Sequence, residues 1–370
     1  MDKKKDLLIL AVGGTGGHLY PAQALAQELK QKNSEMDFLF LGCGLSSNFF
    51  FNQKAFSYVD ISSGVFFIKK PWMWLKTSFC LIKGIFQSVQ ILKAKKPTLV
   101  IGFGSFHSFP ILVATYLLKI PYILFESNAV LGKVNQLFAK KAKHLAYQFF
   151  DVELEKNIKA VKVTMPILQE KRAVVSQKQA REKYGLDPTA LTLLVFGGSQ
   201  GALSLNHAVL AAMPLLKKQI EFFQIIHLIG FNTDVNFVKN TYLKLGISAY
   251  VGQYEEKMSD AYSAADALIA RAGSNTIAEQ LLFKLPTLFI PYPYLKDQHQ
   301  NFNAQYIAKQ VQGAFVIEHK EMTPQKLADR LQKLIENISP MKLAIDAFQK
   351  RKQDLPLVDL VIHTLEKITC

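Results

Sequence analysis

The sequence predicts an α/β protein of two domains, each built on a doubly wound parallel sheet. Short apolar runs alternate with helix-like segments, and this alternation begins again in the second half of the chain. Strands that are buried on both faces of a parallel sheet read as continuous apolar runs. A chain of 370 residues, 49% of them hydrophobic, is long enough to bury two such cores.

The apolar runs fall into two groups. The first group is 7–12, 37–41, 98–101, 122–125 and 144–147, and the second is 191–196, 222–228, 267–270 and 287–290. A stretch rich in Lys, Arg and Gln, 169–188, separates the two groups. We therefore expect a linker near Pro166 that divides a first domain, 1–165, from a second domain, 166–357. A final helix, 358–370, is expected to pack back on the first domain.

The composition favours a basic protein of a reducing compartment. The formal net charge of +15 and a pI near 9.5 suit an anionic partner such as nucleic acid, acidic lipid or a phosphorylated small molecule. Cys43, Cys80 and Cys370 form no CxxC pair, which argues against a disulfide framework. The N-terminal apolar run ends at glycines without a cleavage site, and 106–125 is broken by two prolines and a lysine. We therefore expect neither a signal peptide nor a membrane-spanning helix.

A glycine-rich loop follows the first predicted strand of each half. GGTGGH at 13–18 precedes a predicted helix at 21–29, and GGSQG at 197–201 precedes another at 205–216. Glycines let the backbone approach a phosphate, and a helix N-terminus adds partial positive charge. One such loop is equally well a tight turn. Together with GFGSF at 102–106, however, the pair indicates anion sites on both walls of one cleft. The absence of a GK[ST] motif and of clean GxGxxG spacing disfavours a nucleoside triphosphatase and a simple dehydrogenase.

Polar side chains gather after the last two predicted strands. RAGSNT at 271–276 precedes a helix that contains Glu279, and DQHQNFN at 297–303 follows the other strand. Taken alone, the first segment reads as a helix cap, with Glu279 as the partner in a capping box. Two amide- and carboxylate-rich helix starts at adjacent strand ends also suit recognition of ribose and sugar hydroxyls.

These segments together resemble the MurG family. The matching stretches are GGTGGHLYPAQALA, GFGSFHSFP, ESNAVLGKVNQ, GGSQGALSLN, RAGSNTIAEQ and DQHQNFNA, which occur in the family's order and cover most of 7–310. The family transfers N-acetylglucosamine from its UDP derivative to undecaprenyl-diphospho-muramoyl-pentapeptide in bacterial peptidoglycan synthesis. The resemblance implies a GT-B fold of two Rossmann-like domains with an interdomain cleft. It also implies an inverting transfer to the muramoyl 4-hydroxyl of lipid I, giving lipid II, by a peripheral protein on the cytoplasmic face of the plasma membrane.

The resemblance also implies site residues. The donor contacts fall on Thr15, Gly16, Gly17, Asn128, Ser199, Gln200, Glu255, Ser274, Asn275, Thr276, Ile277, Ala278, Glu279 and Gln300. Glu279 would hold the ribose hydroxyls, Gln300 the sugar hydroxyls, and Glu255 would contact uracil through its backbone. The acceptor diphosphate would face Gly14, Gly104 and Ser105.

Three family motifs are altered in this chain. The family's GGY is Gly104-Ser105-Phe106, and its HEQN is FESN at 125–128. Its GNPVR is TMPIL at 164–168, which removes an arginine expected near the donor diphosphate. Arg172, four residues further on, is a candidate substitute.

Inverting transfer needs a base for the acceptor hydroxyl. His18 is the best candidate, because histidine ionises near neutrality and the glycine loop would present it to the cleft. The alternative is a capping or core histidine. Glu126 is a second candidate base or a partner that orients the acceptor. The chain has no DxD motif and no His/Cys cluster with ligand spacing, so we expect no cofactor and no bound metal. Helix N-terminal amides at 199–201 would support the departing diphosphate instead.

A basic, aromatic segment, 69–97, combines an apolar stripe with lysines. Leu75, Phe79, Ile82, Phe86 and Val89 fall on one helical face, Trp72 and Trp74 extend it, and Lys69, Lys70, Lys76, Lys83, Lys93, Lys95 and Lys96 supply charge. This pattern is typical of a helix that lies in an anionic membrane surface. The alternative is a core-packing helix with a solvated face. Nucleic acid is a disfavoured partner, because no recognisable RNA- or DNA-binding signature is present.

The expected partners are therefore UDP-N-acetylglucosamine, undecaprenyl-diphosphate-linked muramoyl-pentapeptide and an anionic membrane surface. Two other functions stay open. One is a different GT-B transferase that uses a UDP-sugar and a glycolipid. The other is a UDP-sugar epimerase or a catalytically silent UDP-sugar-binding protein, which the altered motifs allow.

Overall fold

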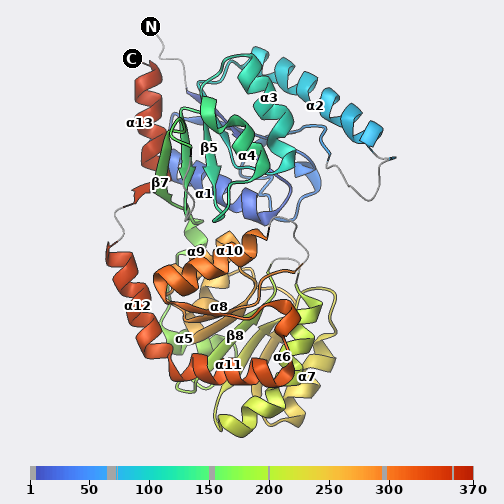
Figure 1. The fold of residues 1–370 in the computed structure, drawn as a ribbon, viewed down its shortest axis with the longest axis vertical. Coiled ribbons are helices and arrows are strands. Elements are labelled where there is room, and N and C mark those ends of the chain that lie inside the picture. The colour runs from blue at the N-terminus through green and yellow to red at the C-terminus, as the bar shows by residue number, and fades with distance from the viewer. Residues whose placement is uncertain are drawn as a thin grey trace. The chain divides into compact units, whose positions relative to one another are not determined.

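The computed structural model describes residues 6–64, 72, 74–149, 155–198, 201–293, 298–351 and 354–369. The chain forms two compact units, each with its own sheet (Figure 1). The first unit comprises Met1–Leu168 with Asp354–Cys370, and the second comprises Gln169–Gln353. Six residues named above, Lys69, Lys70, Ser199, Gln200, Asp297 and Cys370, lie outside the described residues.

The first unit is built on a parallel sheet with the strand order β14-β7-β6-β5-β4-β1-β2-β3. Its strands are β1 (Leu7–Ala11), β2 (Asp37–Gly42), β3 (Ser57–Asp60), β4 (Leu99–Gly102), β5 (Tyr122–Glu126), β6 (His144–Tyr147), β7 (Ala160–Thr164) and β14 (Leu355–Pro356). Its α-helices are α1 (Gly16–Lys32), α2 (Trp74–Lys95), α3 (Phe109–Leu117), α4 (Lys133–Phe138) and α13 (Leu357–Thr369).

Alternate residues of these strands point to opposite faces of the sheet and are buried on both. Ile9 and Val100 belong to a core cluster shared with α2, α3 and α4. Leu8 and Leu10 are also fully buried. The C-terminal helix α13 packs against α1, and Asp359 of α13 pairs with Lys32 of α1. The last helix of the chain therefore belongs to the first unit, although α12 before it belongs to the second.

The second unit repeats this architecture with the strand order β10-β9-β8-β11-β12-β13. Its strands are β8 (Thr192–Phe196), β9 (Gln224–Leu228), β10 (Ser248–Gly252), β11 (Ala267–Ala270), β12 (Thr287–Phe289) and β13 (Ala314–Val316). Its α-helices are α5 (Gln177–Lys183), α6 (Leu203–Gln219), α7 (Val235–Lys244), α8 (Met258–Ala264), α9 (Ser274–Leu282), α10 (His299–Tyr306), α11 (Pro324–Glu336) and α12 (Ile338–Arg351).

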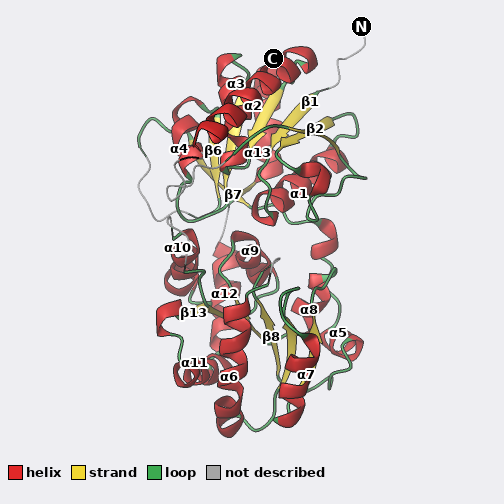
Figure 2. Cartoon of the chain, turned by 90° about the vertical axis from the view of Figure 1, so that its right-hand side faces the viewer, coloured by secondary structure: helices red, strands yellow, loops and turns green. Residues whose placement is uncertain are grey.

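The second sheet has a separate apolar core on each face. Leu193 and Val195 of β8 pack with residues of α6, α7 and α11. Leu194 and Phe196 of the same strand pack with residues of α5 and α8 on the other face. Figure 2 shows the helices of each unit enclosing its strands. Both units are thus parallel sheets with helices on both faces, which confirms the predicted fold class.

Both sheets reverse their direction of winding at the same place. Counted along the chain within each unit, the first six strands have the order 3-2-1-4-5-6, so the reversal falls between β1 and β4 and between β8 and β11. In open α/β sheets, ligands bind outside the carboxyl ends of the strands at this point. The glycine loops at 13–18 and 102–106 follow β1 and β4, and GGSQG follows β8.

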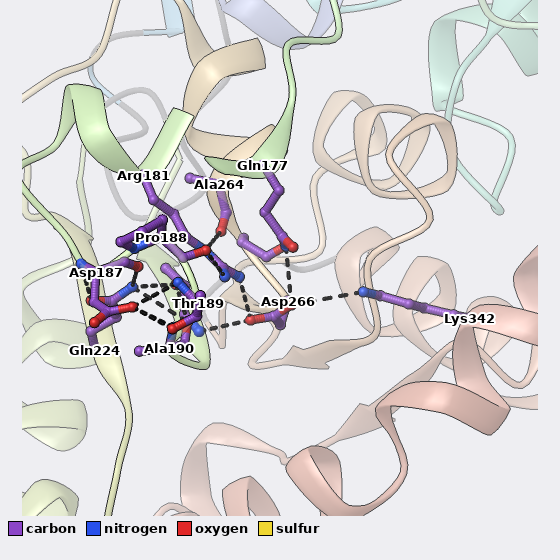
Figure 3. Close-up of polar contacts among 12 residues, drawn as sticks. Gln177, Arg181, Asp187, Pro188, Thr189, Ala190, Gln224, Ala264, Asp266 and Lys342 are labelled. Atoms are coloured by element: carbon purple, nitrogen blue, oxygen red, sulfur yellow. Dashed lines mark hydrogen bonds and ion pairs between the residues drawn. The ribbon is translucent and has the colours of Figure 1, made fainter. Parts of the chain in front are cut away.

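A buried ion pair lies at the opposite edge of the second sheet, where strands begin (Figure 3). Arg181 of α5 is 3% exposed, and its Nη2 lies 2.6 Å from Oδ2 of Asp266, the residue before β11. Arg181 also donates to the carbonyls of Ala264 and Pro188, at 2.9 and 3.0 Å. The backbone N–H of Thr192 donates to the same Asp266 oxygen at 2.8 Å. The pair therefore fastens α5 to the first residues of β8 and β11.

We predict that Arg181→Met destabilises the protein by about 3 kcal/mol, because it removes the buried cation from the Asp266 carboxylate and leaves two carbonyls without the guanidinium donor. Lys183→Met is the matched control. Lys183 lies on the same helix as Arg181 and pairs with Asp260 of α8, but half of its side chain is exposed, so its loss should cost less than about 1 kcal/mol. Urea unfolding of the full chain measures both values. Equal losses for the two variants would contradict the structural role of Arg181.

Candidate functional site

The first glycine loop is shorter than the sequence suggested. The predicted helix began at Pro21, but α1 begins at Gly16, so His18 lies in its first turn and not on the loop. The backbone N–H groups of His18 and Leu19 both donate to the carbonyl of Thr15, at 3.1 Å each. Glycine has a low helix propensity, so the local sequence did not indicate this turn.

The ring of His18 is oriented by the neighbouring loop. Its Nδ1 lies 2.7 Å from the carbonyl oxygen of Phe103. Because a carbonyl only accepts, Nδ1 carries the proton in this hydrogen bond, and in the neutral ring the lone pair is on Nε2. A Cβ placed on Gly104 would lie 3.6 Å from Cε1 of the ring, so the second loop passes close to the histidine. The structure therefore presents His18 as an Nδ1–H tautomer with a basic Nε2.

The loops after β1 and β4 touch at a position that only glycine fits. A Cβ placed on Gly13 would lie 2.4 Å from the Cβ of Ser105. Ser105 itself has φ 74° and ψ 150°, a conformation that glycine favours and that costs other residues roughly 1–3 kcal/mol. Its hydroxyl accepts from the backbone N–H of His107 at 3.3 Å, which caps η3 (Phe106–Ser108). The side-chain amide of Asn48 donates to the carbonyl of Gly14 at 2.7 Å. The contact between the two loops therefore brings together Gly14, Gly104 and Ser105, the residues expected near the acceptor diphosphate.

Glu126, at the end of β5, has four hydrogen-bond donors around a buried carboxylate. The N–H and the side-chain amide of Asn128 donate to Oε1, at 3.1 Å each, and Gly132 N–H and Asn135 Nδ2 donate to Oε2, at 3.0 Å each. Burial raises the pKa of Glu126, and these hydrogen bonds act against the rise. Asn135 also lies beside Gly104, where an added Cβ would be 3.4 Å from its Nδ2. The Glu126 carboxylate therefore holds the 127–135 segment, and its two expected roles, a base or a partner that orients the acceptor, stay predictions.

Two glycines of the GGSQG segment in the second unit have positive φ values. Gly198 and Gly201 have φ values of +92° and +74°, and the N–H of Gly201 donates to the carbonyl of Gly198 at 3.0 Å. A Cβ on Gly201 would lie 2.8 Å from the Cα of Gly230 in the segment that follows β9. Glycine is therefore required here for close packing between two strand ends.

Arg271, which follows β11, holds three elements together. Its Nη1 donates to the carbonyls of Ile290 and Pro291 after β12, at 2.9 Å each, and its Nη2 donates to the hydroxyl of Ser204 in α6 at 3.0 Å. Its guanidinium lies 5.7 Å from the ring centroid of Tyr292. The sequence indicated no role for Arg271. In the structure, its contacts shape the carboxyl edge of this sheet.

The capping-box interpretation of Glu279 is wrong. The N-cap of α9 is Gly273, which has no side chain to cap the helix, and Glu279 is the sixth helical residue. The Glu279 carboxylate instead pairs with Lys171 at 2.8 Å and accepts from the Tyr262 hydroxyl at 2.7 Å. Five of the expected donor residues on this helix, Ser274, Thr276, Ile277, Ala278 and Glu279, are buried, and Asn275 is half-buried.

Two more residues expected to bind the sugar nucleotide, Gln300 and Glu255, form side-chain hydrogen bonds within the protein. Oε1 of Gln300 accepts from the backbone N–H of Tyr292 at 2.9 Å, which joins α10 to the end of β12. The Glu255 carboxylate accepts from the Tyr184 hydroxyl at 3.0 Å and from Lys257 N–H at 2.9 Å. The side chain of Glu255 is therefore used within the fold, and its expected contact with uracil through the backbone stays a prediction.

Helix α2 exposes a row of large apolar side chains to solvent. The α2 stripe, defined as Leu75, Phe79, Ile82 and Phe86, is 84%, 68%, 66% and 64% exposed, and Trp72 and Trp74 beside it are also exposed. Val89, expected on the same face, is half-buried against the core. The buried face of α2 carries Thr77, Gly84, Ser88 and Leu92. A Cβ on Gly84 would lie 1.8 Å from the carbonyl oxygen of Ser62, so small residues allow close packing here.

Within the described ranges, no group of three or more His, Cys, Asp or Glu side chains could hold a metal ion. None of the helices that the structure describes is both long enough and apolar enough to cross a membrane. The expectation that the protein uses no metal stays a prediction.

Comparisons with known proteins define the class. Residues 8–147 match the glycosyltransferase family 28 N-terminal domain, and residues 192–356 match the glycosyltransferase family 28 C-terminal domain. The crystal structure of Acinetobacter baumannii MurG is similar to this chain, with a TM-score of 0.74 and 25% identity, covering 98% of this chain and 100% of that one. The chain is a glycosyltransferase with the GT-B fold.

The relatives then identify the family. The chain is 36% identical to the UDP-N-acetylglucosamine–N-acetylmuramyl-(pentapeptide) pyrophosphoryl-undecaprenol N-acetylglucosamine transferase of Protochlamydia amoebophila strain UWE25, covering 97% of this chain and 96% of that protein. The protein of the same name from Chlamydia pneumoniae is 34% identical, covering 95% of this chain and 93% of its own. This chain belongs to that family, the MurG family, which confirms the resemblance seen in its motifs.

We predict that Ser105→Gly is more stable than Ser105→Ala by about 1 kcal/mol. Alanine keeps the Cβ in a conformation suited to glycine, whereas glycine relieves that strain at the cost of extra freedom in the unfolded chain. Both variants lose the hydroxyl that caps η3, so the comparison isolates the backbone. Urea unfolding of both variants measures the difference. A Gly variant that is less stable than the Ala variant would show that Ser105 is not strained.

Proposed function

We propose that this chain transfers N-acetylglucosamine from UDP-N-acetylglucosamine to the muramoyl 4-hydroxyl of undecaprenyl-diphosphate-linked muramoyl-pentapeptide, converting lipid I into lipid II. The observation that carries the proposal is similarity over nearly the whole chain to relatives that bear this activity in their name. The polar groups at the carboxyl edges of the two sheets supply the chemistry that such a transfer needs.

The donor nucleotide is assigned to the second unit. Glu279 would accept hydrogen bonds from the ribose hydroxyls, and Gln300 would bind the sugar hydroxyls through its amide nitrogen, since its oxygen already accepts from Tyr292. The first turn of α9 begins at Ser274, where helix N–H groups without intrahelical partners suit an anionic ligand. Ser199, Gln200, Glu255 and the first-unit residues Thr15, Gly16, Gly17 and Asn128 complete the proposed donor set.

The acceptor and the proton transfer are assigned to the first unit. Nε2 of His18 would take the proton of the muramoyl 4-hydroxyl as its oxygen attacks the anomeric carbon. The bond from that carbon to the β-phosphate oxygen breaks on the opposite face, and its electron pair leaves with UDP, which inverts the configuration. Phe103 holds Nδ1, so the ring is oriented before substrate binds. Gly14, Gly104 and Ser105 would face the acceptor diphosphate, and Glu126 would hold the loop beside them.

The test is a transfer assay with a lipid I analogue and three donors, the UDP derivatives of N-acetylglucosamine, glucose and galactose. Transfer of N-acetylglucosamine in preference to the other two sugars supports the proposal. Preference for another sugar or another glycolipid would indicate a different GT-B transferase. Binding of UDP-N-acetylglucosamine without transfer would indicate a silent binding protein, and conversion of the sugar without an acceptor would indicate an epimerase.

We predict that His18→Ala lowers kcat in this assay by about 10²- to 10⁴-fold, the usual contribution of a general base. The KM for the donor should change little, because the side chain of His18 is assigned to the acceptor hydroxyl and is not among the proposed donor contacts. His363→Ala is the matched control, since His363 is exposed on α13, and it should leave kcat unchanged. Wild-type kcat in the His18→Ala variant would remove His18 from the mechanism.

We predict that transfer continues in excess chelator at an unchanged rate. Helix N-terminal amides after β8 are assigned to the leaving diphosphate, so no divalent cation is needed to neutralise it. The measurement is the initial rate with and without EDTA, followed by addition of magnesium. Loss of activity in EDTA and its return with magnesium would overturn this assignment.

The α2 stripe is proposed to dock on an anionic membrane surface, where the lipid-linked acceptor is found. Lys76 and Lys83 are exposed on the same helix, so apolar side chains and positive charge face solvent together. A helix of this kind lies in the interface with its apolar side chains among the lipids. The proposed location is therefore peripheral, on the cytoplasmic face of the bacterial plasma membrane, and nucleic acid is not a proposed partner.

We predict that Phe79→Gln with Ile82→Gln weakens binding to vesicles of phosphatidylglycerol and phosphatidylcholine by tenfold or more. The pair removes two exposed apolar side chains, while the buried face of α2 is unchanged. Leu243→Gln with Leu343→Gln is the control, because both leucines are exposed in the second unit. Cosedimentation measures the binding. Equal effects of the two double variants, or none from either, would remove α2 as the docking surface.

A further inference from the structure

Glu279 has two partners that its expected ribose contact does not explain. It is 6% exposed, and each carboxylate oxygen binds a different side chain. The Lys171 ammonium lies 2.8 Å from Oε1, and the Tyr262 hydroxyl donates to Oε2 at 2.7 Å. Burial raises the pKa of Tyr262 well above its usual range, so the phenol remains a donor. Tyr262 therefore fixes the direction of the carboxylate, and Lys171 balances its charge.

Lys171 comes from the segment where the chain departs from its family. It is the last residue of η5 (Gln169–Lys171), three residues after the altered 164–168 motif. The Ser259 hydroxyl donates to the carbonyl of Glu170 at 3.3 Å, which fastens η5 to the start of α8. The sequence pointed to Arg172 as a substitute cation. The cation that the structure brings to Glu279 is its neighbour Lys171.

A carboxylate that binds ribose lies in the same nucleotide site as a diphosphate. Both are anionic, and like charges a few ångströms apart repel strongly where the surroundings are poorly solvated. A cation that reaches both groups removes this repulsion. Lysine suits the task, because its charge is compact and its four-carbon stem lets the ammonium change partner.

We propose that Lys171 is a diphosphate-binding residue of the donor site. When ribose hydroxyls bind Oε1 of Glu279, the Lys171 ammonium moves from that oxygen to the neighbouring phosphate of a nucleoside diphosphate, and Tyr262 keeps the carboxylate in place. This assignment rests on the proposed function, since it takes Glu279 as the ribose ligand. It gives the chain a cation in place of the arginine that TMPIL lacks.

The test is calorimetric titration of the full chain with uridine and with UDP. In Lys171→Met the affinity for UDP should fall tenfold or more, whereas that for uridine should change less than threefold, because uridine has no phosphate. Lys171→Arg should retain most of the UDP affinity. Arg172→Met is the matched control, one residue away, and should change neither ligand by more than threefold. The salt dependence of UDP binding should also weaken in Lys171→Met, since one ionic contact is lost.

Removing Lys171 alone leaves a buried carboxylate without its counter-ion, which can impair folding. The same comparison is therefore made in a Glu279→Gln background, where that charge is absent. There, adding Lys171→Met should still weaken UDP tenfold or more and leave uridine unchanged.

Equal losses for uridine and UDP would reduce Lys171 to a support for Glu279 and overturn the proposal. The proposal would also be overturned if Arg172→Met lost the preference for UDP over uridine while Lys171→Met kept it. A wild-type chain that binds neither UDP nor UDP-N-acetylglucosamine would contradict the proposed function itself, which is a separate result.

Discussion

The reversal of winding at the centre of each sheet is the constraint on which the candidate site depends. Strands β1 and β4 in the first unit, and β8 and β11 in the second, are neighbours whose following helices leave in opposite directions. No crossover covers the carboxyl ends of such a pair, so the loops after them form the edge at which a ligand can bind. Each unit has such an edge. The expected acceptor residues lie in the first unit, and most of the expected donor residues lie in the second.

Close approach of the loops at this edge determines which residues are possible there. Gly13 and Gly201 have no room for a Cβ, and Ser105 is held where glycine would be relaxed. Glycine loops present only backbone groups, so the side chains proposed to act, such as His18 and Glu279, come from the helices beside them. Each is oriented by a second contact, as Phe103 orients His18 and Tyr262 orients Glu279. These supporting contacts connect segments that lie far apart in the sequence.

That separation explains what the sequence could and could not predict. All nine predicted apolar runs form strands whose ends lie within two residues of those expected. Strands that are buried on both faces are apolar along their whole length, so they can be recognised from the sequence. The strands that were not predicted include β3, β10 and β13, which lie at sheet edges, where half-exposed residues break the apolar run. The helical position of His18 and the pairing of Lys171 with Glu279 depend on tertiary contacts, which no local pattern encodes. Arg172 was the natural candidate from charge alone, and only the path of η5 distinguishes it from its neighbour.

Helix α2 carries an exposed apolar surface that the packing of the first unit does not use. A helix on a sheet normally turns its large apolar side chains inward, but α2 places Gly84 and Ser88 against the body of the first unit. The close packing that these small residues permit is already complete, so the fold gains nothing from the exposed α2 stripe. Exposed apolar side chains in a row favour association, and the stripe therefore has a cost that core packing does not offset. Since the fold does not require the stripe, its exposure supports the membrane contact proposed for α2.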